Sequence, residues 1–205
     1  MKRPIAEFLT MALRAGSEAE HAHDEREAWQ ILRRKQGYVT HRIYQHASEP
    51  LQRLVYSEWE SPKAAAGARQ HLQATPLMRR LRGLLTAPPQ RLVVELTGPL
   101  TSTKGLDLPG DAVAASALTH LASDMATWRP LEEQLWQTLS KQPGHITHVL
   151  FRGVDNRLLV GSFSHWADAD SFQQALTQIE GSVASGVTEA VARPLEYVLY
   201  TPARD

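Results

Sequence analysis

Residues 29–59, WQILRRKQGYVTHRIYQHASEPLQRLVYSEW, align without a gap with residues 136–166, WQTLSKQPGHITHVLFRGVDNRLLVGSFSHW, at a shift of 107 positions. Nine of the 31 aligned pairs are identical, whereas unrelated chains of ordinary composition would share roughly two. The identical pairs are Trp29/Trp136, Gln30/Gln137, Leu32/Leu139, Gly37/Gly144, Thr40/Thr147, His41/His148, Leu51/Leu158, Ser57/Ser164 and Trp59/Trp166. The sequence therefore predicts an internal duplication, whose two copies pack together as a dimer within one chain.

The composition is typical of a globular protein without a charged partner. Of 205 residues, 42% are hydrophobic, and 22 Lys and Arg balance 22 Asp and Glu. This neutral balance argues against nucleic-acid binding, which needs a basic excess. The chain has no cysteine, so disulfides, thiolate metal sites and a cysteine nucleophile are excluded. We expect no signal peptide and no membrane partner, because no apolar run reaches the ~18 residues that span a bilayer. A cytoplasmic location follows as the default.

The first copy has the pattern strand, helix, strand, strand, helix, strand. We predict strands over 5–13, 38–46, 51–59 and 91–96, and a long helix over 17–35 that opens with a capping box of Ser17 and Glu20 and ends before Gly37. The pairs Ser61-Pro62 and Thr75-Pro76 are typical helix starts. The hairpin at 38–59 is the best-defined part of this pattern.

The second copy repeats that order. Strands are expected over 113–121, 145–153, 157–166 and 195–200, with a helix over 124–141 and another that Asp168 caps. Residues 97–112 contain three glycines and two prolines, which is typical of a linker. We therefore predict a first unit over 1–97, a linker over 98–112 and a second unit over 113–205.

This βαββαβ order predicts an α+β fold made of ferredoxin-like units, each with four antiparallel strands and its helices on one face. The other face of each sheet needs a cover, and a second copy supplies one. We expect two tandem ferredoxin-like βαββαβ units packed sheet-to-sheet as an intrachain pseudo-dimeric α+β barrel, which could associate further into a homodimer.

The first copy resembles the antibiotic-biosynthesis-monooxygenase-type domain of the dimeric α/β-barrel superfamily. The resemblance rests on the glycine before the hairpin, Trp59 at its end, and the helix stretch His71-Leu72 followed by Thr75-Pro76. It covers residues 5–97 well and 113–200 more loosely, since Gln178 stands where His71 would be. It implies cofactor-free oxygenation of aromatic phenols, quinol oxidation, or haem binding and degradation. A second Trp and a downstream His are missing here, with Leu77 in the place of the latter, which disfavours haem degradation.

Two histidines are candidate catalytic residues. A neutral imidazole at His71, near Arg69 and Arg79, suits general-base work close to neutral pH, although a hydrogen bond to a helix-end carbonyl is the better explanation of it. His41 recurs as His148, which fits a pocket role but is better explained by packing. Strict alternation would place Val39, His41 and Ile43 on one sheet face.

Trp59, Tyr44 and Arg79 are candidate ligand-pocket residues, with the two aromatic rings as walls. Trp59 and Trp166 are more simply core anchors. The arginines at 79, 80 and 82 spread around a helix, so a solvated face with ion pairs explains them better than an anion site. Metal ligation has little support: His21 and Glu25 have workable spacing on a helix that we expect to be solvated, and His145 and His148 should face opposite sides of their strand.

No phosphate-binding glycine loop, dinucleotide fingerprint, HExxH or GxSxG occurs, so we expect no cofactor. The favoured hypothesis is a cofactor-independent oxygenase that acts on an aromatic phenol or quinol in a pocket between the sheet and helices of residues 5–97. The alternative is a non-catalytic module for binding or regulation. The second copy is expected to have a filled pocket, because Leu159, Phe163 and Phe172 replace Gln52, Tyr56 and Ala65.

Overall fold

A computed structural model of the chain describes residues 4–97, 103, 105, 108–109, 111–122, 124–182, 187, 189–192 and 196–203, with backbone only at 179–182 and 196. It divides into two compact units. The first comprises the described residues up to Leu96, together with Thr103, Pro202 and Ala203; the second comprises Thr97 and the described residues from Gly105 to Thr201. Most of the linker expected over 98–112 lies outside the described residues.

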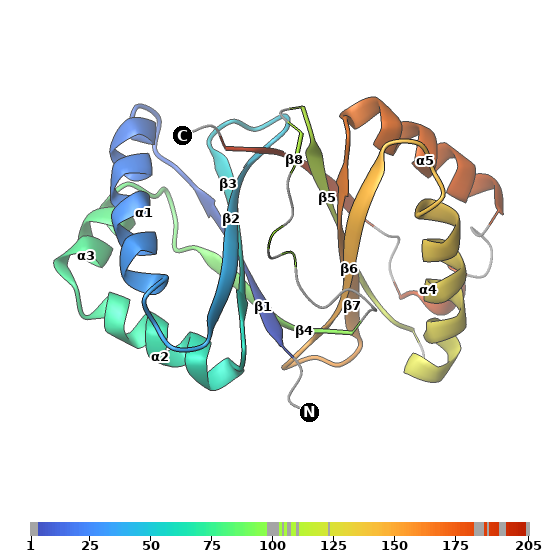
Figure 1. Cartoon of the computed structure of the whole chain (residues 1–205), viewed down its shortest axis with the longest axis horizontal. Coiled ribbons are helices and arrows are strands. Elements are labelled where there is room, and N and C mark those ends of the chain that lie inside the picture. Colours follow the sequence, from blue (N-terminus) through green and yellow to red (C-terminus); the bar gives the residue numbers. More distant parts are fainter. Residues whose placement is uncertain are drawn as a thin grey trace. The chain divides into compact units, whose positions relative to one another are not determined.

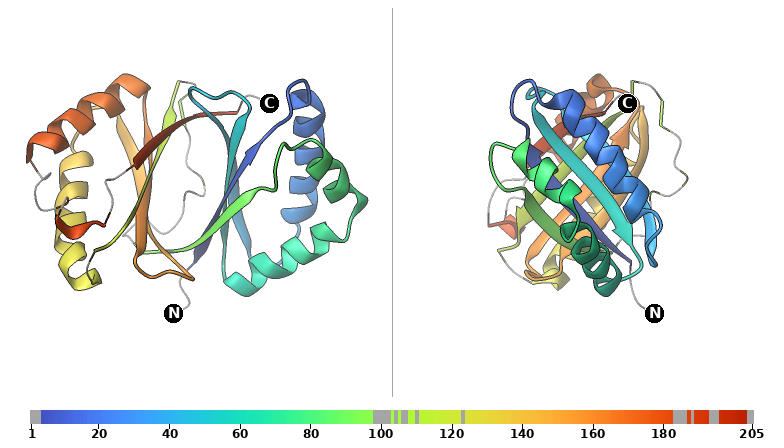
Figure 2. Two further views of the ribbon diagram at one scale, coloured as in Figure 1. Left: turned by 180° about the vertical axis from the view of Figure 1, so that it is seen from behind. Right: turned by 90° about the vertical axis from the view of Figure 1, so that its left-hand side faces the viewer.

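The first unit contains strands β1 (Ile5–Ala12), β2 (Tyr38–His46), β3 (Gln52–Trp59) and β4 (Gln90–Leu96), and helices α1 (Glu18–Leu32), α2 (Pro62–Gln73) and α3 (Pro76–Gly83). All strand pairs are antiparallel, and β1 lies between β3 and β4 while β2 pairs with β3. The three helices cover one face of this sheet (Figure 1). Seen from outside, they lie in front of the strands (Figure 2, right).

The second unit repeats this arrangement. Its strands are β5 (Val113–His120), β6 (His145–Gly153), β7 (Leu159–Trp166) and β8 (Glu196–Pro202), and its main helices are α4 (Met125–Leu139) and α5 (Ala169–Ser182). Here β5 lies between β7 and β8, and β6 pairs with β7. Both helices cover one face of the sheet (Figure 1).

Each unit thus has the strand order of a ferredoxin-like fold, and the predicted α+β class with two tandem units is confirmed. Apolar side chains from the helices and from alternate strand residues build one core on the helix-covered face of each sheet. Among the described residues, no helix is long and apolar enough to span a membrane.

Gly37 and Gly144 occupy the same turn in the two units. Their φ angles are +82° and +79°, a region that only glycine adopts without strain. The Gly37 carbonyl accepts a hydrogen bond from the Glu60 amide at 2.8 Å, and the Gly144 carbonyl accepts one from the Ala167 amide at 2.7 Å. A side chain would also collide with the first turn of the following helix, at Ala64 or Ser171. The glycine that the two copies share at this position is therefore explained by the structure of the turn.

The predicted helix caps have mixed outcomes. Ser61 and Asp168 accept hydrogen bonds from the amides of Ala64 (3.2 Å) and Ser171 (2.7 Å), as expected for helix N-caps. The capping box at Ser17 is wrong. Its hydroxyl instead donates to the carbonyls of Arg14 (2.7 Å) and Leu84 (3.2 Å), because the side chain is buried against the end of α3.

Candidate functional site

Four rings form the same cluster in each unit, which we call the ring cluster: Trp29, Tyr38, His41 and Trp59 in the first, and Trp136, His145, His148 and Trp166 in the second. His41 stacks on Trp29 with 3.9 Å between ring centroids, and His148 stacks on Trp136 at 3.9 Å. Tyr38 meets Trp59 edge-on at 5.6 Å, and His145 meets Trp166 edge-on at 5.1 Å. The rare residues that revealed the duplication are therefore in contact with one another.

Ser57 and Ser164 anchor the ring cluster to the strand. The indole N–H of Trp59 donates to Ser57 at 3.1 Å, and that of Trp166 donates to Ser164 at 2.9 Å. Each serine pairs across the strands with the histidine of its cluster. Because a buried indole needs one hydrogen-bond acceptor, this shared serine is explained by packing and not by catalysis.

The histidines of the ring cluster are held neutral. Burial lowers the pKa of His41 to about 4, helped by the positive charge of Arg33, and burial lowers the pKa of His148 to about 4. The Nδ1 atom of His41 lies 2.6 Å from the Tyr38 hydroxyl, and its Nε2 lies 3.4 Å from Arg33. With both ring nitrogens engaged, His41 is a packed side chain in the described structure.

A β-bulge in each hairpin overturns the predicted strand alternation. The register of β2 with β3 shifts between Tyr38 and Thr40, and that of β6 with β7 shifts between His145 and Thr147. The bulge brings Tyr38 to the same face as His41. It also brings His145 to within 3.3 Å of His148, so the expectation that these two histidines face opposite sides is wrong.

The remaining predicted site residues do not share one pocket. His71 on α2 and Arg79 on α3 are exposed. Trp59 is buried in the helix-side core. Tyr44 pairs with Leu54 of β3. Because side chains alternate along a strand, Leu54 and its partner Tyr44 lie on the sheet face opposite to that of Trp59.

On that opposite face, the Glu58 carboxylate is fully buried. Its Oε1 accepts hydrogen bonds from the Tyr56 hydroxyl (2.8 Å) and the Thr103 amide (2.6 Å). Both residues are also buried. Because three buried groups satisfy one another here, we read this cluster as structural.

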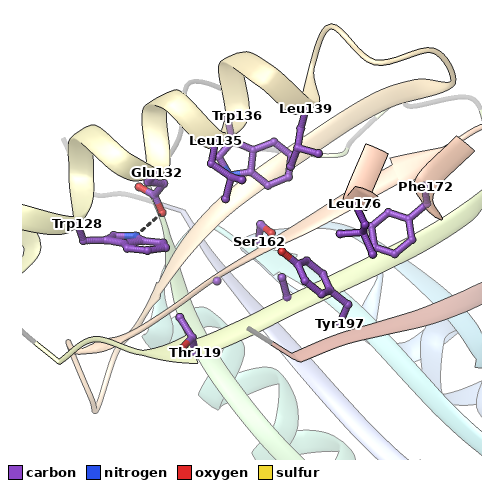
Figure 3. A pocket seen from close by; sticks show the side chains of 12 residues that line it. Thr119, Trp128, Glu132, Leu135, Trp136, Leu139, Ser162, Phe172, Leu176 and Tyr197 are labelled. Atoms are coloured by element: carbon purple, nitrogen blue, oxygen red, sulfur yellow. Dashed lines mark hydrogen bonds between the residues drawn. The ribbon is translucent and has the colours of Figure 1, made fainter. Parts of the chain in front are cut away.

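The described structure has a cavity between helices and sheet in the second unit (Figure 3). Its apolar walls are Trp128, Leu135, Trp136, Leu139, Phe172 and Leu176, and its polar groups are Thr119, Glu132, Ser162 and Tyr197. The space open to the centre of a water molecule is about 20 Å³, room for about one water. All these residues are buried except Leu176 and Tyr197, which are half-buried.

Smaller sheet residues open this cavity in the second unit. Ile5 and Val113 pair with Trp59 and Trp166 respectively, so Leu9, Met11 and Val55 correspond to Ala117, Thr119 and Ser162. The three apolar side chains of the first unit pack against its helix-side core. Their smaller counterparts line the cavity, and Trp128 and Phe172 on the helices fill only part of the difference.

The prediction that Leu159 and Phe163 fill the pocket of the second copy is wrong. Leu159 and Phe163 lie on β7 at positions that alternate with Ser162 and Trp166, so they face away from the helices. Of the three residues on which that prediction rested, only Phe172 lines the cavity.

Glu132 is the single carboxylate of the cavity lining. It is 9% exposed, and its Oε1 accepts a hydrogen bond from the Trp128 indole N–H at 3.1 Å, as Figure 3 shows. Burial raises the pKa of Glu132, while the Trp128 hydrogen bond and the nearby Arg129 charge oppose the rise. A carboxylate in this setting is a stronger base than an exposed one.

The first unit has a matching carboxylate at Glu25, 107 positions before Glu132. It is also 9% exposed, and its Oε2 lies 3.8 Å from Nδ1 of His21, four residues earlier on α1. The expectation that His21 and Glu25 are solvated is wrong, because the helix turns both toward the sheet. Extending the repeat alignment four residues upstream would have revealed this pair, which sequence reasoning missed.

Among the described residues, one group of side chains has metal-ligand geometry: His23, Asp24 and Glu27 on α1. Arg80 already binds it, with its guanidinium donating to both Asp24 oxygens at 3.0 and 3.1 Å and to Glu27 at 3.0 Å. This ion pair satisfies the acidic groups, and it agrees with the expected solvated face of α3.

No family model and no curated protein matches the sequence. Solved structures do match the fold. A proposed monooxygenase from Fusobacterium nucleatum subsp. nucleatum aligns over 98% of this chain and 93% of its own at a TM-score of 0.76 and 8% identity. An anthrone oxidase-like protein aligns over 100% and 92% at 0.70 and 12%. A proposed chlorite dismutase aligns over 100% and 96% at 0.70 and 14%.

The chain therefore shares its fold, two ferredoxin-like units in tandem, with these solved structures. At these identities the likeness concerns the fold alone, and the named proteins differ in the reactions their names suggest. Function must therefore be argued from the site. A haem, which the resemblance noted in the sequence implies, does not fit this cavity: the space is far smaller than a porphyrin, and none of the described residues that line it is a histidine that could bind iron.

Proposed function

We propose that this protein is a cofactor-independent oxygenase of the monooxygenase-like fold, which acts on an aromatic phenol or quinol in the cavity of its second unit. The observation that carries the proposal is one buried carboxylate, Glu132, facing an aromatic and aliphatic cavity. The anthrone oxidase-like protein and the monooxygenase of the same fold are consistent with such chemistry. The proposed site therefore lies in the second unit, whereas the sequence suggested the first unit with His71 and His41.

Glu132 acts as the general base. Burial raises the pKa of Glu132. The difference between this pKa and that of a phenol becomes smaller, which favours transfer of the phenol proton to the carboxylate. The Trp128 N–H holds one carboxylate oxygen, which leaves the other to accept the phenol proton. Trp136 and Phe172 provide flat apolar walls against an aromatic ring, and the closed lining keeps water from the deprotonated substrate.

The reaction balances without an external reductant. Glu132 takes the phenol O–H proton, and the electron-rich phenolate reduces dioxygen as a new C–O bond forms at the ring carbon para to the hydroxyl. The O–O bond then breaks and that carbon loses its C–H proton, so one oxygen becomes a quinone carbonyl. The other oxygen leaves as water with the two protons. Phenol and dioxygen thus give quinone and water, with all four electrons supplied by the substrate. A quinol, which has no C–H at that carbon, instead gives two electrons and two protons to dioxygen and yields quinone and hydrogen peroxide.

Oxygen uptake with a panel of phenols, naphthols and quinols tests this proposal. We expect uptake with at least one substrate, a loss of 100-fold or more in Glu132→Gln, and full activity in Glu25→Gln, the matched carboxylate of the first unit. No uptake across the panel contradicts the proposal, and so does equal activity of wild type and Glu132→Gln.

The small volume of the cavity favours a second candidate, a non-catalytic small-molecule-binding or regulatory protein of the same fold. The cavity has room for about one water. A phenol needs more space than this, so it would fit only if a lining side chain such as Leu176 or Tyr197 moved. Saturable binding of a phenol without oxygen uptake would support this candidate over the oxygenase.

A further inference from the structure

We propose that the cavity of the second unit selects ligands by charge and hydrogen bonding: it accepts an uncharged aromatic molecule that donates a hydrogen bond to Glu132, and it rejects aromatic carboxylates. This inference rests on the proposed site and names the class of molecule that the site takes. It concerns binding, so it can be tested without turnover.

Charge is the first reason. Of the residues that line the cavity, Glu132 and Tyr197 are the ones that titrate, and neither is a cation. A bound carboxylate would lie beside the buried Glu132 carboxylate with no lining cation to compensate. Two like charges a few ångströms apart in a partly desolvated site repel strongly, and burial without a partner adds a desolvation cost. The positive charge of Arg129 acts on Glu132. Arg129 is exposed to solvent, however, so water screens its charge and it offsets only part of the repulsion.

The acceptor geometry of Glu132 is the second reason. Within the described part of the chain, Trp128 is the side chain that hydrogen-bonds this carboxylate, through Oε1. A carboxylate has room for about four hydrogen bonds. The cavity side of Glu132 therefore suits a ligand O–H, and a charge-assisted bond of this kind is stronger than one between neutral groups.

Trp128 is a positioning residue in this site. Its indole packs in the helix-side core and is 3% exposed, so its N–H holds the carboxylate in one orientation. The hydrogen bond also lowers the pKa of Glu132. In the first unit His21 and Glu25 occupy the same two positions at 3.8 Å, beyond hydrogen-bond distance.

Three probes of similar size test the inference by calorimetric titration near pH 7: phenol, anisole and benzoate. Phenol is a neutral donor, anisole lacks the donor, and benzoate is an anion. We expect wild type and Glu25→Gln to bind phenol at least tenfold more tightly than either other probe. In Glu132→Gln the preference for phenol over anisole should fall below threefold, and benzoate should gain affinity. Unfolding midpoints establish that each variant is folded.

Trp128→Phe separates positioning from packing. It keeps an aromatic ring in the core and removes the donor, so the pKa of Glu132 should rise. The acid limb of the pH profile of phenol binding should move to higher pH, an effect that loss of packing alone does not cause. An unmoved limb contradicts the positioning role.

Equal affinity for phenol and benzoate in wild type, an unchanged order in Glu132→Gln, or no binding of any probe at millimolar concentration overturns the inference. Selective binding without oxygen uptake supports it and leaves the oxygenase proposal to fail separately.

Discussion

The two units share their hairpins and differ in the space beneath their helices. Both keep the ring cluster, the serine that accepts from its Trp, and a left-handed glycine before the hairpin. Beneath the helices the first unit packs Leu9, Met11 and Val55, where the second has smaller residues around a cavity. Duplication thus preserved the groups that build the fold, while the interior side chains diverged.

Charge follows the same division. In the first unit Arg69 of α2 forms an ion pair with the buried Glu7 of β1, in the space between helix and sheet. In the second unit the corresponding residues are Leu176 and Ala115, so this ion pair has no counterpart there. Glu132 is left as the lone charged group of the cavity lining. Among the described residues, Glu132 is thus a cavity-lining carboxylate without the arginine partner that Glu7 has in the first unit.

Truncating the tryptophan of the ring cluster should produce the largest loss of stability. We expect Trp59→Ala and Trp166→Ala each to lower the free energy of unfolding by about 3–5 kcal/mol, because each indole is at most 1% exposed. Urea unfolding followed by circular dichroism measures this, with Leu158→Ala, 47% exposed, as a near-neutral control. If the two losses differ by more than about 2 kcal/mol, the two clusters are not equivalent.

Replacing the hairpin glycines should cost less and should also affect both units. Gly37→Ala and Gly144→Ala force a side chain into a positive φ and against Ala64 or Ser171, at a cost of about 1–3 kcal/mol each. The same urea series measures the effect, and Gly83→Ala, where an added Cβ meets nothing, provides the control. Neutral substitutions at 37 and 144 would show that the turn relaxes readily.

Acid should destabilise both units through the ring-cluster histidines. Their pKa is lowered from 6.5 to about 4, so between these values the unfolded chain binds protons that the folded chain does not. The free energy of unfolding must therefore fall as pH drops from 6.5 to 4, by roughly 1–2 kcal/mol for the pair after allowance for partial exposure. In urea unfolding at several pH values, His41→Gln and His148→Gln should each remove about half of this dependence; an unchanged slope in both contradicts the assignment.

Much of the fold could be predicted from the sequence, because hairpin patterns and the repeat are local signals. Strand bounds at 38–46 and 145–153 agree with the structure to the residue. The site could not be located in the same way. The cavity depends on which residues of β1 and β5 pair with Trp59 and Trp166. Equivalent residues of β1 and β5 are 108 positions apart, whereas equivalent residues of the two hairpins are 107 positions apart. The bulges at Tyr38 and His145 likewise reverse faces that alternation assigns.

Glu132 shows a further limit of sequence reasoning. Its helix also carries charged residues on its outer side, so the sequence of α4 does not reveal that this one carboxylate is buried. The identity of Glu25 and Glu132 was visible in the repeat, but identity alone points to a shared position. The functional difference between the two lies in the side chains around them, such as Leu9 against Ala117, which only strand pairing brings into correspondence.

The stoichiometry of phenol binding tests the central claim, that one unit carries the ligand site, most directly. Calorimetric titration of wild type, Glu25→Gln and Glu132→Gln would measure both the number of sites per chain and their affinity. The account predicts one site per chain, unchanged in Glu25→Gln and weakened at least tenfold in Glu132→Gln. Two equivalent sites per chain, or a site weakened by Glu25→Gln and not by Glu132→Gln, would contradict it.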